Sequence, residues 1–281
     1  MTPRVEARAR GMRPKRSLGQ NFLTNAGIAR KMAELACIGP GDTVVEVGPG
    51  RGMLTRCLLS SAGRVLAVEK DDGLVDHLRH VFSGEDRLVL VHGDILECDL
   101  HELVPQGAKI VANLPYNIAS RFVLRLTEAA GAIDRAVLML QKEVADRLCA
   151  KPSDTAYSAL TVIVSASFST SPGFTVGPAN FFPRPKVDSR VVVLTPRSPA
   201  GDMPDPGIFA RVVRSAFSRR RKVLANTLVH LEGMDARSLS SIAGACSVDL
   251  RSRPQDVSVD AYLSFCREYE AFLGQGRTLH R

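Results

Sequence analysis

The sequence lacks the features that mark several large classes of protein. It has no run of about 18 apolar residues, the length that a membrane-spanning helix needs. It has no Cys-x-x-Cys pair, which leaves a zinc site or a redox motif without support. A disulfide framework is not expected in a chain that buries a full-sized core. We therefore expect no membrane, no metal, and idle thiols in a reducing cytoplasm. The six cysteines are Cys37, Cys57, Cys98, Cys149, Cys246 and Cys266.

Internal repeats and low-complexity tracts are also absent, so the 281 residues are expected to form one large and one smaller domain of ordinary composition. The first 16 residues are basic but have no apolar core, unlike a secretory signal. They predict a disordered basic tail, and a weak organelle transit sequence is the alternative.

Acidic residues are outnumbered, because 29 Asp and Glu stand against 37 Lys and Arg. The net charge is +8 and the pI is about 9.4. Such an excess favours a polyanionic partner, of which nucleic acid is the commonest, while solubility alone is the other interpretation. The basic residues gather at the N-terminus and in the segment 211–222, which has helical periodicity. The candidate nucleic-acid contacts there are Arg219, Arg220, Arg221 and Lys222.

Short apolar runs alternate with helical patterns from Asp42 to about Arg197. Apolar strands separated by helices are typical of a parallel sheet covered on both faces, so we predict an α/β fold. The last two strands, 168–176 and 189–194, have no helix between them and are expected to pair antiparallel at one edge. The parallel strands are predicted at 43–47, 64–69, 88–92, 109–113 and 136–140.

A proline- and glycine-rich segment, 198–207, predicts the domain linker. Beyond it, apolar residues recur at helical spacing, which predicts a small all-helical domain. The expected organisation is a tail over 1–16, a cofactor-binding catalytic domain over 17–197 and a helical domain over 208–281.

Glycines follow the first strand in Glu46-Val47-Gly48-Pro49-Gly50-Arg51-Gly52. Glycine allows positive φ and close approach of the backbone to a ligand. Glu69 ends the next strand, where an acid can accept hydrogen bonds from both hydroxyls of a ribose. A nicotinamide dinucleotide is the rival ligand, but the third glycine comes one residue early for Gly-x-Gly-x-x-Gly, and Glu46 suits a cationic amino acid better than a pyrophosphate. The loop favours S-adenosylmethionine, with a plain tight turn as the alternative.

Asp94 follows the third strand, where it can accept a hydrogen bond from the adenine amine of that cofactor. A helix N-cap is an equally good interpretation of this residue, since aspartate is favoured there.

The tetrapeptide Asn113-Leu114-Pro115-Tyr116 ends the fourth strand. The nitrogen of an exocyclic base amine is a poor nucleophile, because its lone pair is delocalised into the ring. The side-chain oxygen of Asn113 and the carbonyl of Leu114 can accept hydrogen bonds from that amine, while Tyr116 stacks on the base. Catalysis would rest on positioning and fixed dipoles, without a strong general base. A strand-end turn is the alternative for this tetrapeptide. Phe181 is a candidate for the other face of the base, or else a hydrophobic plug before the last strand.

Seven segments, including the glycine turn and the tetrapeptide, follow one another along the chain as they do in one known family. They resemble the small-subunit ribosomal RNA adenine N6,N6-dimethyltransferases, the dimethyladenosine transferases of ribosome biogenesis. The resemblance covers about residues 15–265, with mild departures at Ser158 and Arg219, where the family often has glycine and glutamine. The matching segments are Lys15–Leu23, Glu46–Thr55, Gly93–Asp94, Asn113–Tyr116, Gln141–Ala145, Phe181–Ser189 and Phe217–Leu228.

The resemblance implies a Rossmann-like class I methyltransferase that uses S-adenosylmethionine. It implies transfer of four methyl groups, two to each of two adjacent adenines in the 3′-terminal hairpin loop of small-subunit RNA, within an immature 30S-type subunit. Family spacing favours Phe181 over Phe182 beside the adenine, together with Asn113 and Tyr116, and we expect a monomer. The implied cofactor contacts are Asn21, Leu23, Gly48, Glu69, Asp94 and Asn113.

Three alternatives remain open at this point. A large-subunit RNA adenine methyltransferase of the antibiotic-resistance type shares the loop and the reactive tetrapeptide. A DNA adenine methyltransferase is less favoured, because such enzymes commonly carry Asp at the position of Asn113. A mainly non-catalytic checkpoint of ribosome assembly would use the basic segment to dock on an immature subunit.

Overall fold

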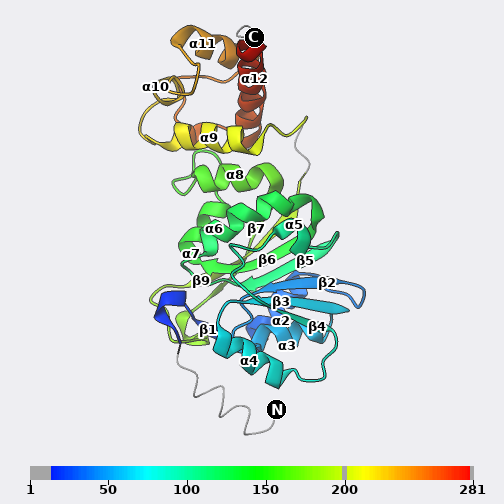
Figure 1. Cartoon of the computed structure of the whole chain (residues 1–281). Coiled ribbons are helices and arrows are strands. Elements are labelled where there is room, and N and C mark those ends of the chain that lie inside the picture. Colours follow the sequence, from blue (N-terminus) through cyan, green and yellow to red (C-terminus); the bar gives the residue numbers. More distant parts are fainter. Residues whose placement is uncertain (1–13, 198–200, 279–281) are drawn as a thin grey trace. The chain divides into compact units, whose positions relative to one another are not determined.

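The computed structural model describes residues 14–197 and 201–278, which form two compact units (Figure 1). One unit takes in the chain up to Asp146 together with Ser169–Pro196, and the other takes in Arg147–Phe168 and the chain from Arg197 onward. Of the tail expected over residues 1–16, the first 13 residues lie outside the described part of the chain.

The first unit is built on a seven-stranded sheet with the order β4-β3-β2-β5-β6-β9-β7. Strands β2 to β6 are parallel, and β9 pairs antiparallel with β6. The N–H of Arg197 donates to the carbonyl of Ser167 at one end of β9, and the Arg190 side chain reaches the Thr175 hydroxyl at the other, so β7 runs antiparallel to β9. The predicted α/β fold with an antiparallel edge is confirmed. The strands are β2 Thr43–Val47, β3 Arg64–Glu69, β4 Leu88–His92, β5 Ala108–Asn113, β6 Ile133–Gln141, β7 Phe168–Val176 and β9 Ser189–Pro196.

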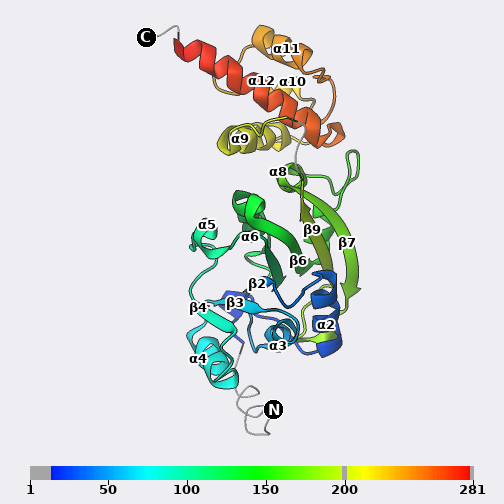
Figure 2. The ribbon, with the colours of Figure 1, turned by 90° about the vertical axis from the view of Figure 1, so that its right-hand side faces the viewer.

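Helices cover both faces of this sheet (Figure 2). Val44, Val65 and Val111 are buried in one cluster with Met32 of α2 and Leu58 of α3. Because successive strand residues point to opposite faces, their neighbours pack on the other side, where Figure 2 shows α5 and α6. The helices are α2 Ala26–Leu35, α3 Met53–Leu59, α4 Asp72–Val81, α5 Leu100–Leu103, α6 Ala119–Leu126 and α7 Lys142–Leu148, followed within the chain by the second unit's α8 Ala159–Ser167.

The order of the strands reverses at β2. The chain proceeds from β2 to β3 and β4 on one side, whereas β5 pairs with β2 on the other. In open α/β sheets, ligands bind beyond the carboxyl ends of the strands at such a switch point. The sheet therefore places the ends of β2, β3 and β5 where a ligand is expected.

A second, two-stranded sheet joins distant parts of the first unit. Strand β1, Phe22–Leu23, pairs antiparallel with β8, Phe181–Phe182, so that Phe22 lies opposite Phe182. The hydroxyl and the N–H of Thr24 both donate to the carbonyl of Asn180, which extends the pairing. The chain segment before α2, with the 3₁₀ helix η1 (Arg16–Leu18), is thereby tied to the segment before β9.

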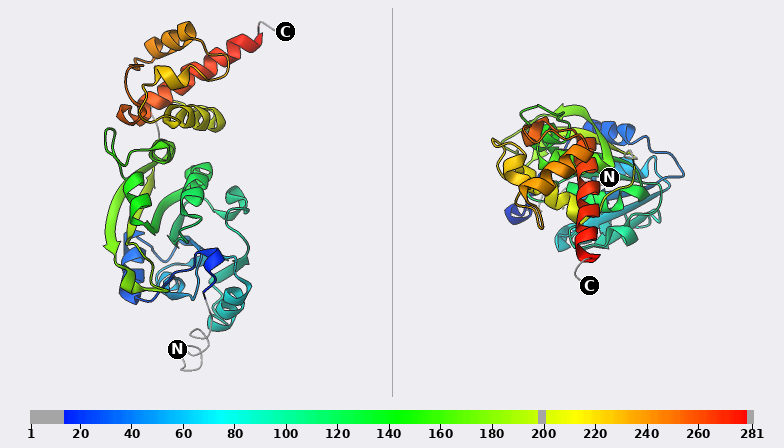
Figure 3. Two further views of the ribbon diagram at one scale, coloured as in Figure 1. Left: turned by 90° about the vertical axis from the view of Figure 1, so that its left-hand side faces the viewer. Right: turned by 90° about the horizontal axis from the view of Figure 1, so that it is seen from above.

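The second unit is helical, as expected for residues beyond the linker (Figure 3). It also includes Arg147–Phe168, which we expected in the cofactor-binding domain. The reason is packing, because Tyr157, Val162 and Ala166 are buried in one cluster with Phe209 and Tyr262. Part of the expected linker, 198–200, lies outside the described residues, and α9 already begins at Pro206 behind the N-cap Asp205. The other helices are α10 Ala225–Leu228, α11 Ala236–Ala245 and α12 Val259–Thr278.

The four basic residues 219–222 lie in a turn and not on a helix, which corrects the expectation of a helix over the whole segment 211–222; Arg211 and Arg214 lie on α9. Helix α9 ends at Phe217 and α10 begins at Ala225. We call residues 218–223 between them the basic turn. Within this turn the N–H of Lys222 donates to the carbonyl of Arg219, and the four basic residues 219–222 are all exposed.

Candidate active site

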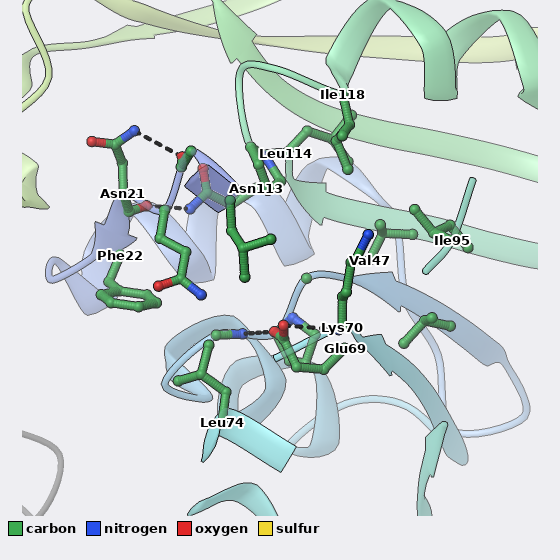
Figure 4. A pocket seen from close by; sticks show the side chains of 18 of the residues that line it. Asn21, Phe22, Val47, Glu69, Lys70, Leu74, Ile95, Asn113, Leu114 and Ile118 are labelled. Atoms are coloured by element: carbon green, nitrogen blue, oxygen red, sulfur yellow. Dashed lines mark hydrogen bonds between the residues drawn. The ribbon is translucent and has the colours of Figure 1, made fainter. Parts of the chain in front are cut away.

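A cavity of about 240 Å³ lies at the C-terminal ends of β2, β3 and β5 (Figure 4). Its wall contains both the glycine turn after β2 and the tetrapeptide that ends β5. The structure thus brings together two parts of the site that are 61 residues apart in the sequence, counted from Gly52 to Asn113. The expected residues that line the cavity are Asn21, Leu23, Gly48, Glu69, Asp94, Asn113, Leu114 and Tyr116.

The glycine turn has the backbone conformation that only glycine adopts easily. Gly48, Gly50 and Gly52 have φ of 68°, 57° and 80°, and Gly52 is the N-cap of α3. A side chain at Gly50 would also collide with the ring of Phe22, since an added Cβ would lie 3.0 Å from its Cδ1. Substitution of these glycines would therefore both strain the turn and displace the cavity wall.

Glu69 closes the turn from the neighbouring strand. Its Oε2 accepts a hydrogen bond from the N–H of Gly50 at 3.1 Å, and its Oε1 accepts from the N–H groups of Lys70 and Asp71, both at 2.9 Å. Burial raises the pKa of this carboxyl, and the three N–H groups offset part of the rise. The carboxylate is thus fixed in orientation at the cavity wall, and its Oε2, which accepts a single N–H, retains a lone pair for a ribose hydroxyl.

Asp94 combines the two roles that the sequence left open. Its Oδ1 accepts from the N–H of Leu96 at 2.9 Å, as in a capping turn, while it also lines the cavity. Its Oδ2 accepts from Lys70 Nζ at 2.7 Å. Burial would raise its pKa, but the hydrogen bonds from Lys70 and Leu96 prevail and hold the pKa below its usual value. Sequence reasoning missed Lys70, although its place directly after Glu69 at a strand end was a usable signal.

Asn113 is held by the N-terminal segment. Its Nδ2 donates to the carbonyl of Asn21 at 3.1 Å, a contact drawn in Figure 4. An amide has its acceptor opposite its donor, so this bond orients Oδ1 of Asn113 as an acceptor for another group. The N–H of Leu114 donates to the carbonyl of Met139 on β6, which fixes the backbone of the tetrapeptide.

Tyr116 is anchored through its hydroxyl. The phenolic oxygen lies 2.8 Å from the hydroxyl of Ser189, a buried residue at the start of β9. Burial raises the pKa of Tyr116, so the phenol stays neutral. A ring fixed at its hydroxyl is a suitable stacking surface, and the contact of Ser189 with the tetrapeptide is one that the sequence did not reveal.

Asp71 ties the N-terminal segment over the cavity, which sequence reasoning missed. Its Oδ1 caps α4 by accepting from the N–H of Gly73, and its Oδ2 accepts from Gln20 Nε2 and pairs with Lys15 Nζ, each at 3.0 Å. Lys15, which we assigned to a disordered tail, is therefore part of the described fold. Gly19, with φ of 63°, packs against Asn117, where an added Cβ would lie 2.6 Å from Oδ1.

Phe181 lies in the core and not in the cavity wall. Its ring is 5% exposed and belongs to one cluster with Leu23 and Val176. This placement agrees with the alternative of a hydrophobic plug before the last strand, because burial of the apolar ring of Phe181 stabilises the fold more than exposure to solvent would. A role beside the adenine stays a prediction, and it requires the ring to leave the core.

Arg220 differs from the rest of the basic turn. Its Nη2 donates to the carbonyl of Thr155 at 2.5 Å and to that of Asp154 at 3.4 Å. This side chain holds the loop before α8, within the second unit. Arg219, Arg221 and Lys222 are the more suitable contacts for phosphate groups.

Glu46 lies beneath the glycine turn and lines the cavity although it is fully buried. Among the described residues, neither of its carboxyl oxygens has a hydrogen-bond partner. A buried polar group without a partner is costly, so such a group in a cavity wall indicates a ligand that supplies a donor or a cation.

These groups fit S-adenosylmethionine. The unpartnered carboxyl oxygens of Glu46 could accept from a cationic amino acid, Glu69 from a ribose and Asp94 from an adenine amine. The described residues contain no group of three or more His, Cys, Asp or Glu that could hold a metal ion. Among the same residues, no helix is both long and apolar enough to cross a bilayer.

Residues 11–271 match the model of a protein family described as ribosomal RNA adenine dimethylase. Two relatives with the name ribosomal RNA small subunit methyltransferase A show the extent of the similarity. That of Geobacter sulfurreducens is 38% identical over 266 residues, covering 92% of this chain and 96% of the relative. That of Moorella thermoacetica is 40% identical over 271 residues, covering 92% and 94%.

Solved structures show the same similarity over nearly the whole chain. A dimethyladenosine transferase from Plasmodium falciparum has a TM-score of 0.76 at 25% identity and covers 89% of this chain and 98% of its own. The 23S rRNA methyltransferase ErmE has a TM-score of 0.67 at 26% identity and covers 88% and 99%. The fold is therefore the one that these two RNA methyltransferases share.

The burial of Glu46 predicts a pH dependence of stability. Burial raises its pKa from 4.5 to about 8, partly offset by the neighbouring Thr55, whereas the unfolded chain keeps the ordinary value. Folding then favours the protonated carboxyl, so the stability present below pH 4.5 is lost as the pH rises through about 8. We expect Glu46→Gln, which mimics the protonated form, to show a smaller fall in Tm across this window than the wild type.

The measurement is differential scanning calorimetry of both proteins without cofactor in the same series of buffers. Glu34→Gln, at an exposed position of α2, is the control and should follow the wild type. Parallel curves for the wild type and Glu46→Gln would contradict the assignment of the pH dependence to Glu46.

Proposed function

Because the chain belongs to the ribosomal RNA adenine dimethylase family, we propose that it transfers methyl groups from S-adenosylmethionine to adenine N6 in small-subunit ribosomal RNA. The targets are two adjacent adenines of the 3′-terminal hairpin loop, each methylated twice. The observation that carries the proposal is the single cavity that holds the glycine turn, Asn113 and Tyr116 together. Its particular substrate is an immature 30S-type subunit in the cytoplasm, and the enzyme acts as a monomer.

The residues of the cavity divide the binding of the cofactor among them. When bound, S-adenosylmethionine would supply a methyl group on a sulfonium centre, from which the neutral thioether is a good leaving group. Gly48 gives close approach at the turn, Glu69 accepts from the ribose hydroxyls and Asp94 accepts from the adenine amine. Asn21 and Leu23, from the N-terminal segment, close the cavity on the remaining side.

The tetrapeptide prepares the target nitrogen. Oδ1 of Asn113, oriented by the bond to Asn21, and the carbonyl of Leu114 accept hydrogen bonds from the two N–H groups of the amine. These bonds draw the nitrogen toward a tetrahedral shape and localise its lone pair. Tyr116, anchored on Ser189, stacks on the base and holds it flat. The acceptor nitrogen becomes acidic once it attacks, so its proton leaves to water and no strong base is needed. The rate enhancement comes from positioning and fixed dipoles.

The second unit supplies the RNA contacts. Its basic turn presents Arg219, Arg221 and Lys222 to solvent, and Arg220 holds the adjoining loop. This arrangement supports binding of phosphate groups by residues that are not needed for the chemistry. A docking role in subunit assembly is compatible with it and would be separable from catalysis.

Methylation of both ribosomal subunits tests the choice of substrate. We expect the purified protein to transfer label from S-adenosylmethionine to unmethylated small subunits, with dimethyladenosine as the product found by mass spectrometry. Large subunits prepared from the same ribosomes are the control. Transfer to large subunits alone would replace the proposal with the large-subunit activity named for ErmE.

Glu69→Ala tests whether binding of the cofactor is separable from binding of the subunit. We expect at least about tenfold weaker binding of S-adenosylmethionine by calorimetry, since hydrogen bonds from the ribose to a charged group are lost and the turn is no longer held through Gly50. Subunit binding in a sedimentation assay should persist, because Glu69 lies in the cavity and not on the basic turn. Glu34→Ala, an exposed change of the same kind, should leave both unaltered. Joint loss of both activities in a protein with a native circular dichroism spectrum would contradict separable roles.

The basic turn is tested through the salt dependence of RNA binding. Arg221→Ala with Lys222→Ala should lower the affinity and reduce the slope of log K against log salt by about 1.5, because two phosphate contacts no longer release counterions. Arg237→Ala with Arg251→Ala removes the same charge from exposed positions elsewhere in the second unit and should leave the slope unchanged. Equal slopes for the two double variants would exclude the basic turn as the contact surface.

A further inference from the structure

The loop between β8 and β9 exposes an unusual combination of side chains. Among the described residues, the large hydrophobic side chains that are exposed are Phe182, Val187 and Met203; Phe182 is the last residue of β8, directly before this loop, and Val187 lies on it. Phe182 is 51% exposed, although an isolated phenylalanine in solvent gains nothing for the fold. Arg184 and Lys186, on the same loop, are also exposed. Exposed aromatic and cationic side chains together are typical of surfaces that bind single-stranded nucleic acid.

Arg51 connects this loop to the cavity. Its guanidinium carbon lies 4.6 Å from the ring centroid of Phe22 and 5.4 Å from that of Phe182, both within cation–π distance. Arg51 and Phe22 line the cavity, whereas Phe182 does not. Phe22 and Phe182 are also partners across β1 and β8. The ring of Phe182 therefore stands at the rim of the cavity, supported by a cation that belongs to its wall.

From these contacts we propose that Phe182 is the stacking site for a nucleotide adjacent to the target adenine. The base of that nucleotide lies on the exposed ring, and Arg184 and Lys186 contact the flanking phosphates. This inference rests on the proposed function, since it assumes RNA as the substrate. A protein partner is disfavoured, because an apolar ring with Arg51 of the cavity wall against it, and with Arg184 and Lys186 following it in the chain, matches a base with its phosphates.

The cation beneath the ring also makes Phe182 suitable for a base. Cation–π contact fixes the ring in one orientation, so that less conformational freedom is lost when a base stacks on it. The pairing of β1 with β8 holds the backbone of Phe182 as well, through residues that already border the cavity.

The same unit contains a matched control. Phe174 on β7 carries Lys31 Nζ at 5.7 Å from its ring centroid, so it too is an aromatic ring with a cation. It is half-buried, however, and neither residue lines the cavity. If any aromatic–cation pair could bind a base, Phe174 would do so as well as Phe182.

Steady-state methylation of unmethylated small subunits tests the proposal. Phe182→Ala should raise KM for the subunits about fivefold or more, the loss expected for one base–aromatic stack, with kcat and cofactor affinity unchanged. Phe182→Tyr should restore KM, while Phe182→Leu, apolar but without a π face, should behave like Phe182→Ala. A Phe182→Leu variant with the KM of the wild type would overturn the proposal. A fall in kcat at unchanged KM would also overturn it, because the ring would then act on the target adenine itself.

A fluorescence experiment tests stacking directly, because the chain contains no tryptophan. Phe182→Trp introduces a single reporter, and a short single-stranded RNA with two adjacent adenines should quench it in a salt-dependent manner. Phe174→Trp, titrated with the same RNA, should not be quenched. Equal quenching at the two positions, or none at position 182, would contradict the stacking site. Failure of the wild type to methylate small subunits would instead remove the proposed function, so the two failures are distinguishable.

Discussion

The bond between Glu69 and the N–H of Gly50 is the contact on which the architecture of the site depends. It joins the end of β3 to the turn after β2, and the other oxygen of the same carboxylate fixes the N–H groups of Lys70 and Asp71. One buried side chain thereby sets the turn that borders a ligand and the start of α4. Asp71 then extends this order to the N-terminal segment through Gln20. The cavity is shaped by a chain of hydrogen bonds from strand to loop to terminus, and the apolar core only supports it.

The N-terminal segment is a structural part of the site and not an appendage. It holds the amide of Asn113 through the carbonyl of Asn21, supplies Phe22 against Gly50 and pairs with β8. Substrate and cofactor groups are thus linked by a segment with little regular structure. Its conformation rests on Gly19, whose positive φ and close packing on Asn117 no other residue satisfies without strain. Changes in this segment are expected to affect both halves of the site together.

Most of the fold could be predicted from the sequence, because apolar runs and glycine turns are local signals. The strands, the antiparallel edge and the residues at the strand ends followed from patterns within short windows. Contacts between distant segments could not be predicted in this way. Nothing local to Phe181 shows that it packs against Leu23, and nothing near Arg220 shows that it holds the carbonyl of Thr155. The basic turn was taken for a helix because its flanks have helical periodicity. The segment 147–168 belongs to the second unit because it packs against Phe209, which lies some 40 residues or more further along the chain.

The three acids of the cavity lie in different surroundings, and this difference shapes its electrostatics. Burial raises the pKa of Glu46 to about 8, so at neutral pH this carboxyl is mostly uncharged until a cation reaches it. Asp94 has a lowered pKa, but Lys70 already balances its charge. A cavity with three ionised and unbalanced carboxylates would attract any small cation and would repel the phosphates of RNA. By keeping one acid neutral and one paired, the site retains acceptors for a cationic cofactor while its rim, with Arg51 at the edge, stays attractive to a polyanion.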